Sequence, residues 1–134
     1  MKKRIFVVDD EWAILELLRI KLTRRGCDVM VARNKNEFLE NVFAYKPHLI
    51  ILDIWLGSEH GGTKLYDEAL ARGFDPEVTA IFFSGLVQEG TPPKRVSSDR
   101  RFALYGKPFD FDIMIEDIFS LLDEKSTVKV DARF

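Results

Sequence analysis

The stretch IFVVDDE, residues 5–11, sets four consecutive apolar residues directly before three acids. Four similar apolar runs follow along the chain. The first four runs are rich in β-branched or aromatic residues, and none of them alternates with polar residues, which is typical of strands buried on both faces. The later runs are residues 29–32, 49–52, 80–83 and 103–105.

Apolar residues recur at helical spacing between these runs. Gly26 supplies a stop for the first such segment, and Asn34, three residues before Glu37, is an N-cap signal for the second. The stretch from residue 88 to 102 is irregular and contains two prolines, so we expect a short or irregular fourth helix there. The segments with a clear helical pattern are residues 11–25, 34–46, 63–72 and 111–122, and one face of the first carries Ile14, Leu17, Leu18 and Leu22.

Strand alternating with helix predicts the α/β class, with a doubly wound, five-stranded parallel sheet covered by helices on both faces. Ligands of such folds bind beyond the carboxyl ends of the strands. We expect a single domain over residues 1–124, and residues 125–134 as a C-terminal tail or the start of a linker.

Composition excludes several classes of protein. The chain has 134 residues, of which 46% are hydrophobic, which is enough for a full core and excludes a wholly disordered chain. The net charge of −2 argues against direct nucleic-acid binding. No apolar stretch approaches the ~20 residues that span a bilayer. Cys27 is the single cysteine, so no internal disulfide is possible, and we expect a cytoplasmic setting.

Polar residues follow four of the predicted strands. They are Asp9 and Asp10 after the first, Asp53 after the third, Ser84 after the fourth and Lys107 shortly after the fifth. Because parallel strands end at the same edge of a sheet, these side chains should meet there. Three carboxylates packed together repel one another, and a hard divalent cation such as Mg²⁺ relieves the repulsion. A metal, a cation and a hydroxyl together are the parts of a phosphoryl-transfer site with a carboxylate nucleophile.

The four motifs together resemble the signature of response-regulator receiver domains of two-component signalling. They are VVDDE at 7–11, LD at 52–53, FSG at 83–85 and KPF at 107–109. The resemblance covers about residues 3–124 and implies a flavodoxin-like receiver fold with strand order 2-1-3-4-5.

The resemblance also implies the metal site. Asp53 would accept the phosphoryl group and bind Mg²⁺ directly together with Asp10. Asp9 would help through a water molecule, and the backbone carbonyl of Trp55 would be a further ligand. As in the family, this chemistry would be limited to self-phosphorylation and self-dephosphorylation, so the chain would not be an enzyme.

The resemblance further assigns Ser84 and Lys107 to the phosphoryl oxygens. A histidine kinase or a histidine phosphotransfer protein would supply the phosphate. The phosphorylated face would then bind a downstream output protein or domain, or a second copy of the chain as a homodimer. No membrane partner is expected.

Four positions bear on the family pattern. Gly57 stands where the family often has proline, and Gly61 stands where glycine is common. Gly85 replaces the common alanine after the hydroxyl residue. The family's switch aromatic would fall at Leu104, with Tyr105 one place later, so the usual coupling of hydroxyl and aromatic movements is not expected.

Three other functions remain to be weighed. A hydrolase with an aspartyl-phosphate intermediate needs a second acid two residues after its nucleophile, where this chain has Trp55. A flavin-binding module needs a phosphate loop rich in Ser, Thr and Gly where this chain has the acids of residues 9–11. The remaining alternative is a degenerate receiver that acts as a phosphorylation-independent interaction module.

Overall fold

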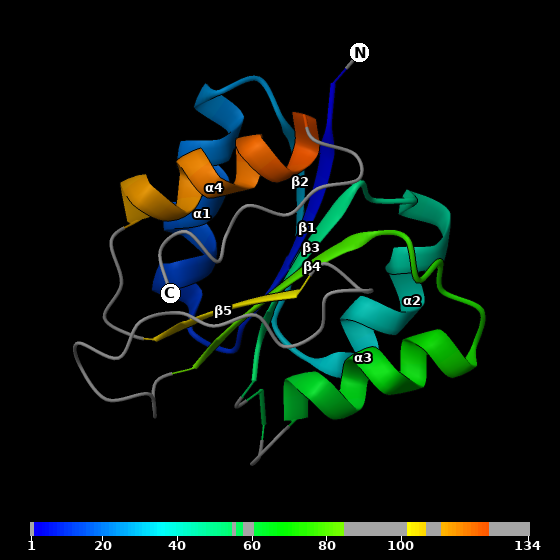
Figure 1. Ribbon diagram of the computed structural model, residues 1–134. Coiled ribbons are helices and arrows are strands. Elements are labelled where there is room, and N and C mark those ends of the chain that lie inside the picture. Colours follow the sequence, from blue (N-terminus) through cyan, green and yellow to red (C-terminus); the bar gives the residue numbers. More distant parts are fainter. Residues whose placement is uncertain (1, 55, 58–60, 85–101, 107–110, 124–134) are drawn as a thin grey trace.

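The computed structural model describes residues 2–54, 56–57, 61–84, 102–106 and 111–123, which form five strands and four helices (Figure 1). In chain order the elements are β1 (Arg4–Val8), α1 (Trp12–Arg24), β2 (Asp28–Ala32), α2 (Lys35–Tyr45), β3 (Leu49–Asp53), α3 (Gly61–Ala71), β4 (Thr79–Ser84), β5 (Phe102–Gly106) and α4 (Phe111–Asp123).

The strands form one parallel sheet in the order β2-β1-β3-β4-β5, which confirms the predicted doubly wound topology. Helices α1 and α4 cover one face and α2 and α3 cover the other, as Figure 1 shows. The expected fifth strand is present as β5 and pairs with β4. Crossovers between parallel strands are right-handed, so the order of strands and helices along the chain determines which helices cover each face of the sheet.

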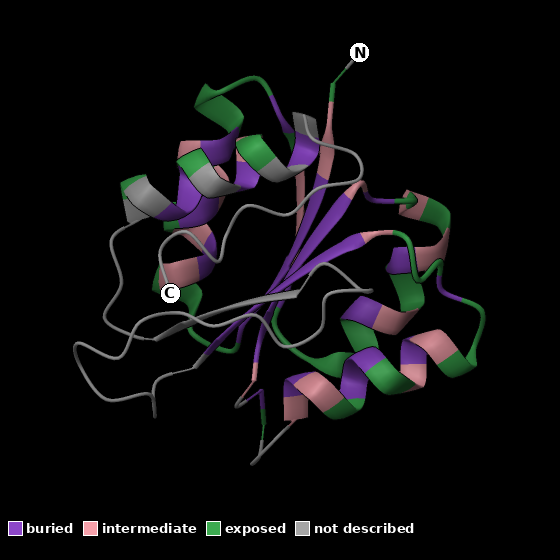
Figure 2. Cartoon of the chain, in the orientation of Figure 1, coloured by how far each residue is buried: buried purple, intermediate pink, exposed green. Residues whose placement is uncertain are grey.

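The core consists of two layers, one on each face of the sheet, and Figure 2 shows the buried strands between them. Side chains of a strand alternate between faces, so Ile5 and Val7 pack toward α1 and α4 while Phe6 and Val8 pack toward α2 and α3. All four side chains are fully buried. This explains the unbroken apolar run of β1, since neither face of the strand meets water.

Helix α1 differs in one detail from the sequence prediction. Its buried positions are Leu15, Leu18 and Leu22, whereas Leu17 is 37% exposed. The predicted stripe was therefore wrong at Leu17, because a helix with several apolar residues allows more than one stripe and the packing on the sheet decides which one is buried.

Two predicted helix signals are confirmed. The Glu37 backbone N–H donates to the side-chain oxygen of Asn34 at 2.9 Å, which caps α2. Gly26 follows α1 with a φ of 89°, a left-handed conformation that glycine adopts without strain.

Some predictions fall outside the described residues. The irregular helix expected within residues 88–102 lies there, except for Phe102 at the start of β5, and so does the tail at 125–134. No helix within the described ranges is long and apolar enough to cross a bilayer.

Candidate functional site

The register of the sheet brings the predicted site residues to one edge. Val8 of β1 pairs with Leu52 of β3, so Asp9 and Asp53 follow at neighbouring positions. Asp53 in turn pairs with Phe83, the residue before Ser84. The Ile54 N–H donates to the carbonyl oxygen of Phe83 at 2.8 Å, which extends this pairing one residue past β3.

Three carboxylates form an acid cluster at this edge, defined here as Asp9, Asp10 and Asp53. One carboxylate oxygen from each lies within 4.8 Å of the others. Asp9 and Asp53 are buried, whereas Asp10 is exposed. The Glu11 N–H donates to Oδ1 of Asp9 at 2.8 Å, which orients this carboxylate at the start of α1.

The donor set of the acid cluster fits Mg²⁺. Hard divalent cations prefer oxygen ligands, and buried carboxylates are costly unless hydrogen bonds or a cation compensate their charge. Two buried carboxylates and one that reaches solvent would leave part of a metal's coordination sphere open to water or phosphate oxygens. The acid cluster thus offers the oxygen ligands that a hard divalent cation prefers.

Ser84 and Gly106 are the last residues of the last two strands. Ser84 is the last residue of β4, and its partner in β5 is Gly106. Lys107 directly follows Gly106, and both Lys107 and Trp55 lie outside the described residues. The strands that lead to the predicted hydroxyl and ammonium groups therefore end at the edge that carries the acid cluster.

The connection from β3 to α3 contains a close backbone approach that sequence reasoning missed. A Cβ atom at Gly62 would collide with the carbonyl oxygen of Asp53, and one at Gly61 would collide with that of Leu56. Two adjacent glycines at the start of a helix were the available signal, because glycine there is unfavourable unless a close contact requires it.

Gly57 has a φ of 70°, which glycine adopts readily. A proline ring holds φ near −65°, so the proline that the family often carries here is incompatible with this backbone. Leu104 and Tyr105 both lie in β5, paired with Phe82 and Phe83. Leu104, which stands where the family pattern has its switch aromatic, is therefore part of a regular strand.

The family comparison agrees with this geometry. Residues 5–118 match the family described as the response regulator receiver domain. The chain is 34% identical over 118 residues to the nitrogen assimilation regulatory protein NtrX of Azorhizobium caulinodans, covering 86% of this chain and 25% of that protein. It is 46% identical over 56 residues to the transcriptional regulatory protein PhoP of Bacillus subtilis, covering 42% of this chain and 23% of PhoP. The chain thus spans about a quarter of the length of these curated relatives.

Solved structures show the same fold. A CheY-like response regulator receiver domain protein from Methanospirillum hungatei superposes with a TM-score of 0.74 at 26% identity, covering 93% of this chain and 97% of that one. The receiver domain of NtrX from Brucella abortus has a TM-score of 0.71 at 32% identity, covering 90% and 98%. Because the family match extends over most of the sequence and includes the acid cluster, the chain belongs to the response regulator receiver domain family, the phosphorylation-based signalling modules of two-component systems.

Proposed function

We propose that this chain accepts a phosphoryl group on Asp53 in a Mg²⁺-dependent reaction and thereby switches its output surface. The observation that carries the proposal is the acid cluster, whose three carboxylates lie within 4.8 Å at the carboxyl edge of the sheet. Asp53 is the candidate acceptor because it ends β3, the central strand, and is buried beside Asp9.

In this proposal Asp10 and Asp53 hold Mg²⁺ directly, Asp9 acts through a water molecule and the Trp55 backbone carbonyl is a further ligand. Mg²⁺ bound by these residues would supply positive charge beside carboxylates that would otherwise repel a phosphate dianion. A carboxylate oxygen of Asp53 then attacks phosphorus in line with the departing group.

Ser84 and Lys107 are proposed to bind the phosphoryl oxygens, the first as a hydrogen-bond donor and the second as a cation. The new phosphoryl group would carry about −1.5 to −2 charge near neutral pH. Attraction of these two residues toward that charge would bias the packing of the segments after β4 and β5. The output response would follow from this local rearrangement.

The proposal extends to partners and setting. A histidine kinase or histidine phosphotransfer protein would donate the phosphate, and an output protein, an output domain or a second copy would read the switched surface. Apart from forming and losing its own acyl phosphate, the chain would turn over no substrate. Residues 1–124 would form the receiver unit, residues 125–134 a tail or linker, and the setting would be cytoplasmic. With a net charge of −2, direct nucleic-acid binding is not proposed.

Intact mass after incubation with acetyl phosphate, with and without Mg²⁺, tests the proposal. We expect a gain of one phosphoryl group that requires Mg²⁺ and disappears in Asp53→Ala. The matched control is Asp67→Asn, an exposed carboxylate on α3 that should leave uptake unchanged. Uptake by Asp53→Ala equal to that of the parent would contradict the proposed acceptor. An inert parent protein would instead support the degenerate receiver.

A further inference from the structure

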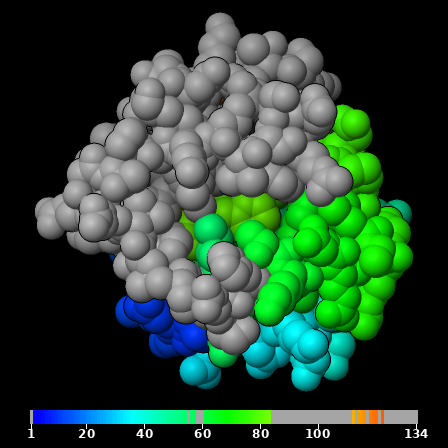
Figure 3. Space-filling model, turned by 60° about the horizontal axis from the view of Figure 1, so that its bottom comes forward, coloured from blue at the N-terminus to red at the C-terminus, as the bar shows by residue number. Residues whose placement is uncertain are grey.

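A pocket of about 490 Å³ lies at the edge of the sheet opposite the acid cluster, beyond the amino ends of β3 and β4. The connection from α2 to β3 forms one of its walls and the connection from α3 to β4 forms the other, and both can be followed in Figure 1. Figure 3 brings the carboxyl edge forward instead, where the surface of α3 (green) adjoins that of the α2 segment (cyan). The pocket is thus separated from the acid cluster by the length of the strands, and its volume suits a small molecule.

Apolar side chains form the inner surface of the pocket. Phe43 of α2 and Phe74, which follows α3, meet edge to face with their ring centroids 6.4 Å apart. Val42, Pro47 and Phe74 are buried, and Val78 is half-buried. Aromatic rings prefer edge-to-face or offset contacts with one another, so this surface favours a ligand that carries an aromatic ring.

The wall from the connection between α2 and β3 offers a cation and a hydrogen-bond donor. Lys46 is exposed, and within the described part of the chain no carboxylate pairs with its ammonium group. The Arg4 N–H donates to Nδ1 of His48 at 2.9 Å, so the neutral ring carries its proton on Nε2. No described residue accepts a hydrogen bond from this Nε2–H. Both groups match a carboxylate.

The wall from the connection between α3 and β4 is acidic. Asp75 and Glu77 line it, and both are exposed. Oδ1 of Asp75 accepts from the Glu77 N–H at 2.9 Å, which orients the Asp75 carboxylate and leaves its second oxygen for a ligand. Among the described residues, no cation pairs with Asp75. A ligand with a single charge would match one wall only, whereas a zwitterion matches both.

We propose that this pocket binds a free amino acid with an aromatic side chain. Its carboxylate meets Lys46 and His48, and its ammonium group meets Asp75. Its ring lies against Phe43 and Phe74. The inference goes beyond the proposed function and does not depend on it, because no residue of the acid cluster lines the pocket.

Three ligands that share a phenyl ring separate these contacts. L-Phenylalanine carries both charges, 3-phenylpropanoate lacks the ammonium group and phenethylamine lacks the carboxylate. Each ligand is titrated into the isotope-labelled chain, and the amide signals are followed by NMR. We expect L-phenylalanine to bind most tightly, with a Kd on the order of 1 mM because its charged contacts are open to solvent. It should shift the signals of Phe43, Lys46 and Phe74 and leave those of Asp10 and Lys64, at the carboxyl edge, in place.

Two variants that each remove one charge test the two walls separately. Lys46→Gln should weaken L-phenylalanine and 3-phenylpropanoate roughly two- to fivefold and leave phenethylamine unchanged. Asp75→Asn keeps an oxygen that can accept from the Glu77 N–H, and it should weaken L-phenylalanine and phenethylamine by a similar factor but leave 3-phenylpropanoate unchanged. Lys64→Gln and Asp67→Asn, at exposed positions of α3, are the matched controls and should change no affinity.

Several outcomes would overturn the proposal. One is the absence of shifts in the pocket signals at L-phenylalanine concentrations well above the expected Kd. Another is equal affinity for the three ligands, or an effect of either variant that does not depend on the charge of the ligand. Tighter binding of 3-phenylpropanoate or phenethylamine than of L-phenylalanine would contradict the zwitterion. These titrations need neither Mg²⁺ nor a phosphodonor, so failure of the proposed function would leave their result unchanged.

Discussion

The backbone N–H of Gly62 donates to the carbonyl oxygen of Ile54 across 2.9 Å. This bond holds the first turn of α3 against the end of β3, next to Asp53. The approach is so close that a Cβ atom at position 62 would overlap the Asp53 carbonyl oxygen. Only a residue without a side chain at position 62 allows α3 to approach the end of β3 this closely, beside Asp53 of the acid cluster.

We predict that Gly62→Ala lowers the free energy of unfolding by about 1–3 kcal/mol, because backbone atoms of Asp53 must move to admit the methyl group. Urea denaturation measures this change. The rate of phosphorylation from acetyl phosphate should fall as well, since the displaced atoms belong to the acceptor. Asp67→Ala on an exposed position of the same helix is the control and should be neutral or slightly stabilising. An unchanged stability of Gly62→Ala would contradict the close approach.

The cap of α2 offers a matched pair of asparagines. The side chain of Asn34 accepts from the Glu37 N–H at 2.9 Å, and the Glu37 carboxylate accepts from the Arg33 N–H at 2.8 Å. We predict that Asn34→Ala costs about 1 kcal/mol of stability. Asn36→Ala, two residues further along and exposed, should cost nothing measurable. Equal effects of the two substitutions in thermal unfolding would show that the cap is not the cause.

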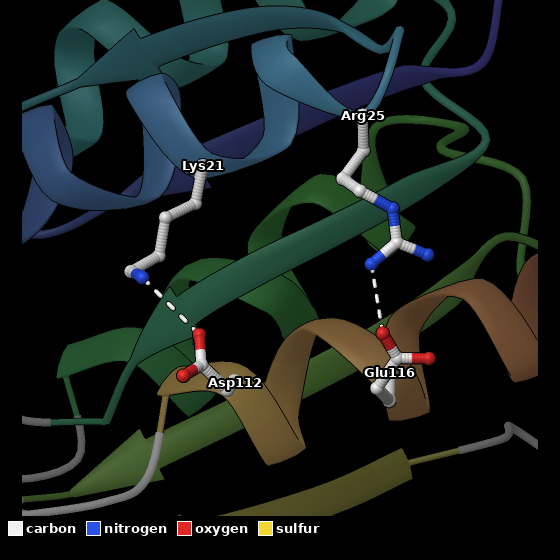
Figure 4. A network of polar contacts seen from close by, with 4 residues as sticks. All are labelled: Lys21, Arg25, Asp112 and Glu116. Carbon is white, nitrogen blue, oxygen red and sulfur yellow. Dashed lines mark hydrogen bonds and ion pairs between the residues drawn. The ribbon is translucent and has the colours of Figure 1, made fainter.

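Two ion pairs join α1 and its C-cap residue Arg25 to α4, as Figure 4 shows. Arg25 donates to Glu116 at 2.8 Å, and its guanidinium also lies 4.3 Å from the ring centroid of Phe119. The Glu116 side chain is 64% exposed, so the ion pair itself is worth at most about 1 kcal/mol. We predict that Arg25→Ala costs more stability than Glu116→Gln, by about 0.5–1 kcal/mol, because only the first removes the contact with the ring.

A double-mutant cycle on Arg25 and Glu116, followed by urea denaturation at low and high salt, measures this difference. The part shared by both residues should shrink at high salt, whereas the part from the ring should remain. Lys21→Ala, which removes the second ion pair at 3.2 Å, is the control for a loss of charge on α1. If Arg25→Ala and Glu116→Gln cost the same, the ring contact contributes nothing.

His48 links stability to pH at the edge of the sheet opposite the acid cluster. The Arg4 N–H donates to Nδ1 of His48 at 2.9 Å, which requires this nitrogen to be unprotonated. Burial, and then the charges of Arg4 and Lys3, lower the pKa of His48 below its usual 6.5. The unfolded chain therefore takes up this proton at a higher pH than the folded protein does. Its contribution to stability is complete above pH 6.5 and is lost as pH falls toward the lowered pKa.

We predict that the stability of the parent falls more steeply than that of His48→Asn as pH falls from about 8 to about 5. The free energy of unfolding across this range, measured by urea denaturation for both proteins, checks the difference. All other titrating groups are common to the two chains and cancel in the comparison. Parallel curves would show that His48 carries no such linkage.

Much of the fold was predictable because its signals are local. The unbroken apolar runs of β1 and β3 indicate strands buried on both faces, and the N-cap at Asn34 needs only residues three positions apart. The buried stripe of α1 was less predictable. Leu15 rather than Leu17 faces the sheet, because the rotation of a helix is decided by what it packs against.

Part of the candidate site was predictable from the sequence, and part was not. The acids after β1 and β3 were visible as residues that follow apolar runs, and parallel pairing alone requires them to share an edge. The contrast between buried Asp9 and exposed Asp10 was not visible, since neighbouring residues at a strand end differ only in the direction of their side chains. Nor was the need for glycine at Gly62, which depends on the approach of another segment.

By itself, the sequence determined the class of fold, the order of strands and helices, and the family, because these depend on residue types and their spacing along the chain. Only the tertiary structure decided that three carboxylate oxygens lie within 4.8 Å of one another and that the segments after α2 and α3 line one pocket at the opposite edge of the sheet. Distances of that kind are set by strand register and helix packing. Both join residues far apart in the chain, and a shift of one position along a strand would turn its side chains to the other face.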